Sequence, residues 1–167
     1  IIVMTLKKEN PKRSKFNTIG LSVSSTYLIL TLIFKWVSFQ EFKQGLESQK
    51  IEYVEMDTKP SPLNSILWSS LIETDKGYRT AYYSLFDKQE ITYSKEFLKN
   101  HHLLEPYLEK KVIKQLIDIS AGWYRIEEKK GKRLCWDLRF GQMGMDVNNA
   151  SFLWYYELNI DETGNVK

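Results

Sequence analysis

Residues 18–39, TIGLSVSSTYLILTLIFKWVSF, decide how the chain is organised. The stretch has a single charged residue, Lys35, and about 20 helical residues cover the roughly 30 Å hydrocarbon layer of a bilayer. Lys35 and Trp36 suit a membrane interface, where the lysine stem snorkels and the indole lies at headgroup depth. The stretch therefore predicts a transmembrane helix at residues 17–39. The alternative is a buried helix of a soluble protein.

Residues 1–16 are predicted to be the end of a preceding membrane helix followed by a basic loop. The first four residues are apolar, whereas a secretory signal places its basic region before its apolar one. A short basic loop between apolar segments is typical of the cytoplasmic side. We therefore expect an inner or plasma membrane protein with an extracytoplasmic soluble domain at residues 40–167. Its expected partners are membrane lipid and upstream transmembrane helices of the same protein.

The charge distribution separates the membrane segment from the rest of the chain. Up to Lys35 there are six basic residues and one acidic residue, which leaves 18 basic and 20 acidic residues in the remainder. The net charge of +3 therefore belongs beside the apolar segment, and the mildly acidic remainder argues against a nucleic-acid partner. Cys135 is the only cysteine, which excludes an intrachain disulfide, and we expect it to be a buried thiol.

The remainder of the chain predicts an α+β domain. Short apolar or alternating runs between turn residues predict strands, and apolar residues at four-residue spacing predict one main amphipathic helix. The fold class is therefore an N-terminal transmembrane helix followed by a largely antiparallel sheet of five or six strands with that helix. The expected strands are 51–56, 63–74, 78–86, 123–128, 133–140 and 152–160, with the helix at 104–119.

Two segments are expected to interrupt regular structure. Apolar residues at 39, 42 and 46 predict a short connector after the membrane helix, and Gly45 argues against a long continuation. Lys59-Pro60-Ser61-Pro62 is predicted to form a loop, because proline lacks a backbone donor and restricts the residue before it. Asp75-Lys76-Gly77 is predicted to form a hairpin turn.

Four short blocks carry a family resemblance: residues 60–68 (PSPLNSILW), 77–78 (GY), 82–87 (YYSLFD) and 137–141 (DLRFG). In order and spacing they resemble the C-terminal region of the YdjM-like membrane-bound metal-dependent hydrolases, in which a membrane helix also precedes them. The resemblance implies that catalysis rests on an N-terminal membrane region with a histidine-rich motif, and that the full-length protein uses a divalent metal. That motif does not occur in this sequence. No cofactor and no catalytic residue is therefore assigned within it.

The candidate site is a polar cluster of Asn64, Asp137 and Arg139. Asp137 and Arg139 are two residues apart on a predicted strand and therefore share a face, with Trp136, Leu138 and Phe140 on the other. A carboxylate and a guanidinium on one face can form a structural ion pair or bind a polar ligand. The loop at 60–64 is expected close to this strand, with Arg139 bonded to a carboxylate or to backbone carbonyls there.

Aromatic residues occur on nearly every predicted strand, and we expect most of them in the core. A groove for a lipid headgroup or a sugar, with Trp68, Tyr82 and Tyr83 as its aromatics, stays open as an alternative.

Metal binding is the less favoured interpretation of the remaining candidates. His101 and His102 are adjacent and point in different directions, so a solvated loop is favoured over a shared metal ion. Asp75 and Asp87 flank turns, where carboxylates bond to the backbone, and Glu73 alone makes no cluster.

Two functional hypotheses follow. In the first, the chain is the C-terminal accessory domain of a membrane-bound metal-dependent hydrolase whose catalytic membrane region lies upstream. In the second, it is a membrane-tethered binding or interaction module without catalysis. Histidine-rich motifs between upstream helices would favour the first, and their absence the second.

Overall fold

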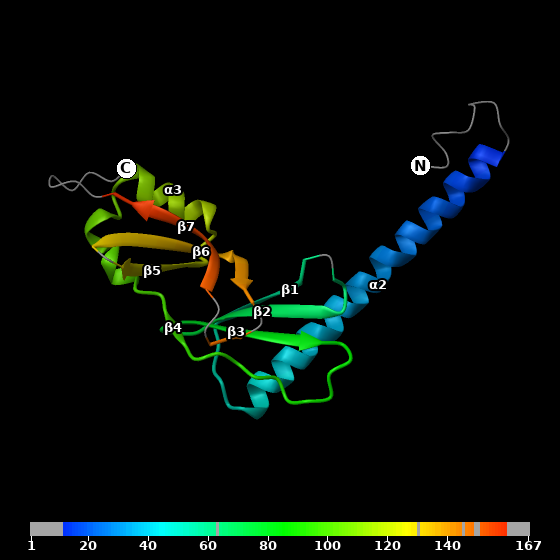
Figure 1. Cartoon of the computed structure of the whole chain (residues 1–167), viewed down its shortest axis with the longest axis horizontal. Helices are drawn as coiled ribbons and strands as arrows, with labels where there is room; N and C mark the ends of the chain where they lie inside the picture. Colours follow the sequence, from blue (N-terminus) through cyan, green and yellow to red (C-terminus); the bar gives the residue numbers. More distant parts are fainter. Residues whose placement is uncertain (1–11, 63, 130, 145, 149–150, 160–167) are drawn as a thin grey trace.

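The computed structural model describes residues 12–62, 64–129, 131–144, 146–148 and 151–159. The chain has one long N-terminal helix, α2 (Lys12–Ser48), and two antiparallel sheets of four and three strands (Figure 1). The predicted α+β class is confirmed, but the single sheet of five or six strands is wrong, because the strands divide into two sheets. Of residues 1–16, predicted to be a helix end and a basic loop, residues 1–11 lie outside the described residues and 12–16 belong to α2.

Helix α2 runs without interruption through the predicted transmembrane segment 17–39 and beyond it. The separate connector expected at 39–46 is therefore wrong, because Gly45 lies inside the helix. A Cβ at Gly45 would overlap with the Tyr93 hydroxyl, which donates a hydrogen bond to the Phe42 carbonyl at 2.7 Å. The glycine thus makes room for a contact between helix and domain, and does not end the helix.

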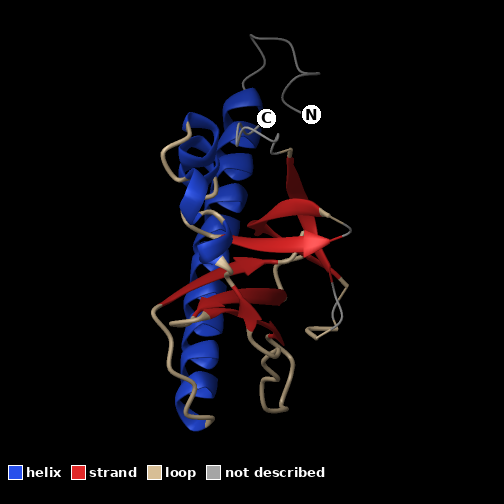
Figure 2. Ribbon diagram, turned by 90° about the vertical axis from the view of Figure 1, so that its left-hand side faces the viewer, coloured by secondary structure: helices blue, strands red, loops and turns tan. Residues whose placement is uncertain are grey.

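The N-terminal part of α2 is exposed, whereas its last third packs against the first sheet. Its apolar 18-residue window has a mean hydropathy of 1.4 and none of it is buried. Among the described residues, α2 is the one helix long and apolar enough to cross a membrane. Burial begins at Thr31 and follows one face through Phe34, Ser38, Phe42 and Leu46. Figure 2 shows both sheets on the same side of α2.

The first sheet has the strand order β1-β2-β3-β4, with all neighbours antiparallel. The predicted hairpin turn joins β2 to β3, where Thr74 N donates to the Gly77 carbonyl at 2.8 Å. The predicted strand 78–86 corresponds to β3, while the two-residue strand β4 has no counterpart in the predictions. The strands are β1 (Glu55–Pro60), β2 (Leu67–Glu73), β3 (Gly77–Ser84) and β4 (Phe97–Leu98).

Strand β1 corrects two predictions. It lies further along the chain than the expected strand 51–56, and it includes Lys59 and Pro60, which the sequence assigns to a loop. Pro60 is accommodated because it is the last residue of an edge strand, where a missing donor disrupts no central ladder. At the expected start of the next strand, residue 63 lies outside the described residues and 64–66 form a turn before β2.

The second sheet has the order β5-β6-β7, again antiparallel. Its strands confirm the three predicted near the C-terminus, although residue 160 of the last lies outside the described residues. Strand β6 is longer than predicted and carries a register shift against β7 between Asp137 and Gln142. The strands are β5 (Tyr124–Lys129), β6 (Lys132–Met143) and β7 (Ser151–Leu158).

The helix predicted at 104–119 is only partly confirmed, because α3 (Lys111–Ile119) covers only its second half. Two short 3-10 turns, η1 (His101–Leu103) and η2 (Glu105–Tyr107), occupy the preceding residues. Lys110 has an extended backbone (φ −72°, ψ 132°), which interrupts the helical path before α3. The apolar spacing is satisfied by burial in a shared core and not by one continuous helix.

Three clusters of buried residues join these layers. One lies between α2 and the first sheet and includes Phe42 and Trp68. A second lies between the η1–α3 segment and the second sheet and includes Ile113. The third joins the two sheets through Tyr78 and Leu138. The first sheet is thus packed by α2 on one face and by the second sheet on the other.

Candidate functional site

A groove of about 350 Å³ lies between the first sheet and strand β6. One wall comes from β1, the residues after it, β2 and β3, and the other from β6 and β7. The lining side chains are both charged and apolar, and they include Lys59, Pro62, Tyr82, Arg139, Phe140 and Leu153.

Arg139 forms a bidentate ion pair with Asp137 at this groove. Nη2 of Arg139 lies 2.6 Å from Oδ2 and Nε lies 3.0 Å from Oδ1, while the Arg139 backbone N donates to Oδ1 at 3.1 Å. The Asp137 side chain is 1% exposed and that of Arg139 is 32% exposed. The hydrogen bond with Asp137 raises the pKa of Arg139, so the guanidinium stays charged.

The register shift in β6 sets the surroundings of this ion pair. Asp137 stands opposite Tyr124 in β5, and pairing with β7 resumes only at Gln142. Leu138 is buried beside Tyr78 of the first sheet, so Asp137 and Leu138 are both buried. Both faces of the second sheet are covered, one by the η1–α3 segment and the other by the first sheet, so two adjacent residues of β6 can both be buried.

Lys59 provides a second cation on the opposite wall. Its Nζ lies 2.6 Å from Oδ2 of Asp57, and these two side chains are 46% and 31% exposed. A lysine carries three N–H donors and an arginine five. A single carboxylate partner therefore leaves some of these donors available to a ligand. Beside the apolar side chains of Phe140 and Leu153, such donors suit a ligand with an anionic group on an apolar body.

The structure does not bring Asn64 to Asp137 and Arg139. The Asn64 Oδ1 accepts hydrogen bonds from the backbone N of Ile66 at 2.8 Å and of Leu67 at 3.2 Å, which stabilises the turn between β1 and β2. It lines a different cavity, of about 510 Å³, between this turn and α2. Residues 60–62, in contrast, line the groove together with Arg139.

The three candidate aromatics do not share one groove. Trp68 and Tyr83, 2% and 8% exposed, stand opposite each other and belong to the core beneath α2. Tyr82 lies on the other face of β3, because adjacent strand residues point to opposite faces. It lines the Arg139 groove, its hydroxyl donates to the Gly144 carbonyl at 3.1 Å, and burial raises the pKa of Tyr82.

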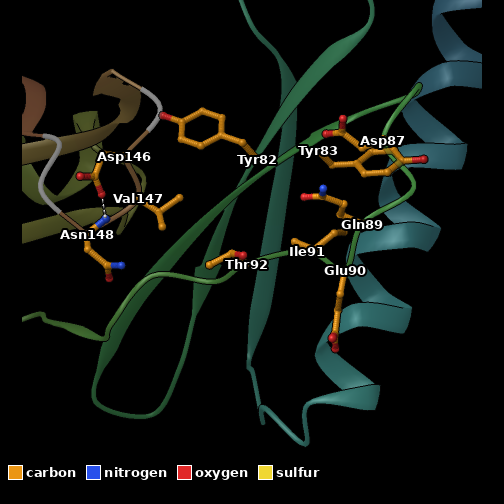
Figure 3. A pocket seen from close by; sticks show the side chains of 10 residues that line it. All are labelled: Tyr82, Tyr83, Asp87, Gln89, Glu90, Ile91, Thr92, Asp146, Val147 and Asn148. Atoms are coloured by element: carbon orange, nitrogen blue, oxygen red, sulfur yellow. Dashed lines mark hydrogen bonds between the residues drawn. The ribbon is translucent and has the colours of Figure 1, made fainter.

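A further cavity of about 380 Å³ lies on the other side of Tyr82 and has carboxylates on two sides (Figure 3). Asp87 Oδ2 accepts a hydrogen bond from Ser84 N at 3.2 Å, and Asp146 Oδ1 accepts one from Asn148 N at 3.0 Å. These carboxylates stabilise loops. Within the described part of the chain, no group of three or more His, Cys, Asp or Glu residues is placed to hold a metal ion.

The other candidates take part in structural contacts. His101 Nδ1 is hydrogen-bonded to the Tyr124 hydroxyl, and Glu73 Oε1 lies 2.9 Å from Lys99 Nζ. Cys135 is 3% exposed, and burial raises the pKa of its thiol to about 12, which keeps it protonated and unreactive at neutral pH.

Sequence reasoning missed Lys59, Phe140 and Leu153 as groove residues. The sequence predicts a loop at Lys59 and places Phe140 on the same face as Leu138, whereas Leu138 is buried and Phe140 is 55% exposed. The local signal is Gly141, whose positive φ of 78° marks an irregularity directly after Phe140.

Comparisons with known proteins find no relative of this chain. No protein-family model matches the chain, and no curated protein or solved structure matches it significantly. The fold and site define an α+β domain of two antiparallel sheets, preceded by a helix with the length and composition of a membrane span.

Proposed function

We propose that the chain is a membrane-anchored binding domain, in which α2 crosses an inner or plasma membrane and the groove beside Arg139 receives an anionic ligand. The observation that carries the proposal is the exposed apolar segment of α2, which continues directly into the domain core.

The exposure of α2 favours an anchor over the other uses of an apolar helix. Leu21, Ile29 and Leu32 are 65%, 58% and 67% exposed, whereas a core helix buries its apolar stripe. A cleaved signal sequence is also disfavoured, because the same helix supplies the fully buried Phe42 and Leu46. Removing α2 would therefore open the core, while lipid around its first part would shield the exposed apolar surface.

Membrane extraction tests this anchor. The full chain should stay in the membrane fraction at alkaline pH, and the double variant Leu21→Glu/Ile29→Glu should be released, because carboxylates within a span are costly. A matched double variant, Gln44→Glu/Ser48→Glu, changes exposed positions of the same helix beside the domain and should stay bound. Release of the unchanged chain, or retention of the first variant, would refute the anchor.

The basic residues Lys12, Arg13 and Lys15 at the start of α2 support an extracytoplasmic domain. A cysteine at exposed Glu52 should then react with a membrane-impermeant maleimide in intact cells, with buried Cys135 as the background. Reaction of Glu52→Cys only after the cells are opened would reverse the proposed orientation.

The resemblance to YdjM-like hydrolases suggests a more specific version, in which this domain is the accessory part of a metal-dependent membrane hydrolase. One observation favours it: residues from three of the four resembling blocks, Pro62, Tyr82 and Arg139 among them, line the same groove. The test is metal-dependent hydrolysis by a protein that includes the sequence upstream of Ile1, compared with its Arg139→Leu variant. If the upstream sequence has no histidine-rich motifs, the accessory-domain hypothesis fails and the membrane-tethered binding module is the function that we propose.

A further inference from the structure

We propose that the turn between β1 and β2 enters the membrane beside α2, where bilayer lipid covers it. This inference rests on the proposed membrane anchor and adds a second point of contact with the bilayer. The turn follows Pro60, includes Ser61, Asn64, Ser65 and Ile66, and lies next to α2, while the β2–β3 turn is at the far end of the same strands (Figure 1).

The depth of the turn follows from a hydrogen bond to α2. The Tyr27 hydroxyl lies 2.9 Å from Ser65 Oγ, in the middle of the exposed apolar segment. Tyr27 is 15 residues after Lys12, a rise of about 22 Å, which is shorter than the roughly 30 Å hydrocarbon layer. If the span begins at Lys15, its roughly 20 residues end near Lys35, which marks the far boundary of the hydrocarbon layer. That boundary lies about 12 Å beyond Tyr27 along the helix. A helix crossing near the membrane normal therefore holds Ser65 about 12 Å below that boundary, within the hydrocarbon layer.

The composition of the turn permits this depth. Residues 60–72 contain no Asp, Glu, Lys or Arg. The β2–β3 turn at the far end of the sheet instead carries Asp75 and Lys76, both exposed. Because charged side chains are costly in lipid, the end of the sheet next to α2 is the one suited to membrane contact.

The backbone of the turn is also largely paired internally. Ser61 N donates to the Leu67 carbonyl at 2.8 Å and Asn64 N to the Ser61 carbonyl at 3.0 Å, while Asn64 Oδ1 accepts from Ile66 N and Leu67 N. The two prolines contribute no N–H at all. An unpaired backbone group in lipid costs several kcal/mol, so this pairing removes much of the cost of insertion.

The space between the turn and α2 can receive part of a lipid acyl chain. This cavity of about 510 Å³ is lined by Tyr27, Thr31, Ser65 and Trp68 among others. The polar groups are paired within the protein: Thr31 Oγ1 donates to the Leu28 carbonyl at 2.8 Å and Trp68 Nε1 to the Ser65 carbonyl at 3.1 Å, so acyl chains can enter without leaving these donors unpaired.

Depth measurements at three positions test the inference. In a Cys135→Ser background, the full chain is reconstituted into phosphatidylcholine and phosphatidylglycerol vesicles with an environment-sensitive fluorophore on one introduced cysteine. Ile66→Cys, at a 39% exposed side chain, probes the turn. Leu21→Cys reports the span, and Lys76→Cys is the matched control on the opposite turn. Unchanged circular dichroism melting would establish that each variant is folded.

Quenching by lipid-attached nitroxides should be strong at Leu21, clearly detectable at Ile66 and absent at Lys76. Quenching at Leu21 together with an aqueous signal at Ile66, equal to that at Lys76, would overturn the inference and leave the anchor intact. Aqueous signals at all three positions would overturn both the anchor and the inserted turn.

Discussion

Replacing Arg139 with leucine should destabilise the domain by about 2 kcal/mol. The change removes both side-chain donors to Asp137 and leaves a carboxylate that is 1% exposed. An unpaired buried acceptor costs about 1–3 kcal/mol, and a broken, fully buried ion pair costs about 3–5 kcal/mol. Here the Arg139 backbone N still donates at 3.1 Å and the vacated site is partly open to water. The lower of the two ranges therefore applies.

Thermal unfolding of the detergent-solubilised chain, followed by circular dichroism, measures this loss. A chain of this size shifts by about 3 °C for each kcal/mol, so the midpoint should fall by about 6 °C. The matched control is Lys132→Leu on the same strand, which removes an ion pair with Glu157 whose side chains are 60% and 33% exposed. Solvent screens that pair, so the midpoint should hardly move.

A double variant separates loss of the pair from loss of packing. Asp137→Asn/Arg139→Leu removes the charge that Arg139→Leu leaves without a partner, so it should be more stable than the single variant. Two results would refute the reasoning: an unchanged midpoint for Arg139→Leu, or an equal fall for Lys132→Leu.

Three further predictions concern other parts of the molecule. Gly45→Ala places a methyl group against the Tyr93 hydroxyl; such overpacking costs about 1–3 kcal/mol, and an unchanged melting midpoint would contradict the close contact. Because burial raises the pKa of Cys135 to about 12 from 9.0, the folded state loses stability as pH rises above about 9, where the unfolded thiol ionises first. Alkaline melting should show this fall, and Cys135→Ala should reduce it. The purified chain with divalent metals should hydrolyse generic phosphate and ester substrates no faster than buffer; reproducible metal-dependent turnover in an independently purified sample would contradict the prediction.

The sequence predicted elements with strong local patterns and missed those that depend on distant contacts. The apolar run of α2 and the β2–β3 hairpin follow from residue periodicity and turn chemistry, so they were predicted correctly. Gly45 and Pro60 were misread, because their tolerance depends on Tyr93 and on the edge position of β1. Tertiary contacts of this kind leave no signal in a single sequence.

In the candidate site, too, the sequence predicts the local contact and misses what depends on the fold. Asp137 and Arg139 are two residues apart, and spacing alone predicted that they could pair. Asn64 also carries hydrogen-bonding groups, but its Oδ1 accepts from the backbone N–H groups two and three residues ahead and so bonds to its own turn. Its amide therefore stabilises the turn beside α2 and is not available to the groove.

The turn between β1 and β2 connects the two proposed surfaces. Pro60 and Ser61 line both the Arg139 groove and the cavity beside Tyr27. A ligand in the groove and lipid at the turn would therefore both contact Pro60 and Ser61. The same geometry constrains the accessory-domain hypothesis. Catalytic residues on upstream membrane helices would lie at the same membrane depth as α2. The turn would then be the part of this domain nearest to them. Variants of the turn should then alter catalysis at the membrane level, whereas Arg139 variants should act on ligand binding in the groove.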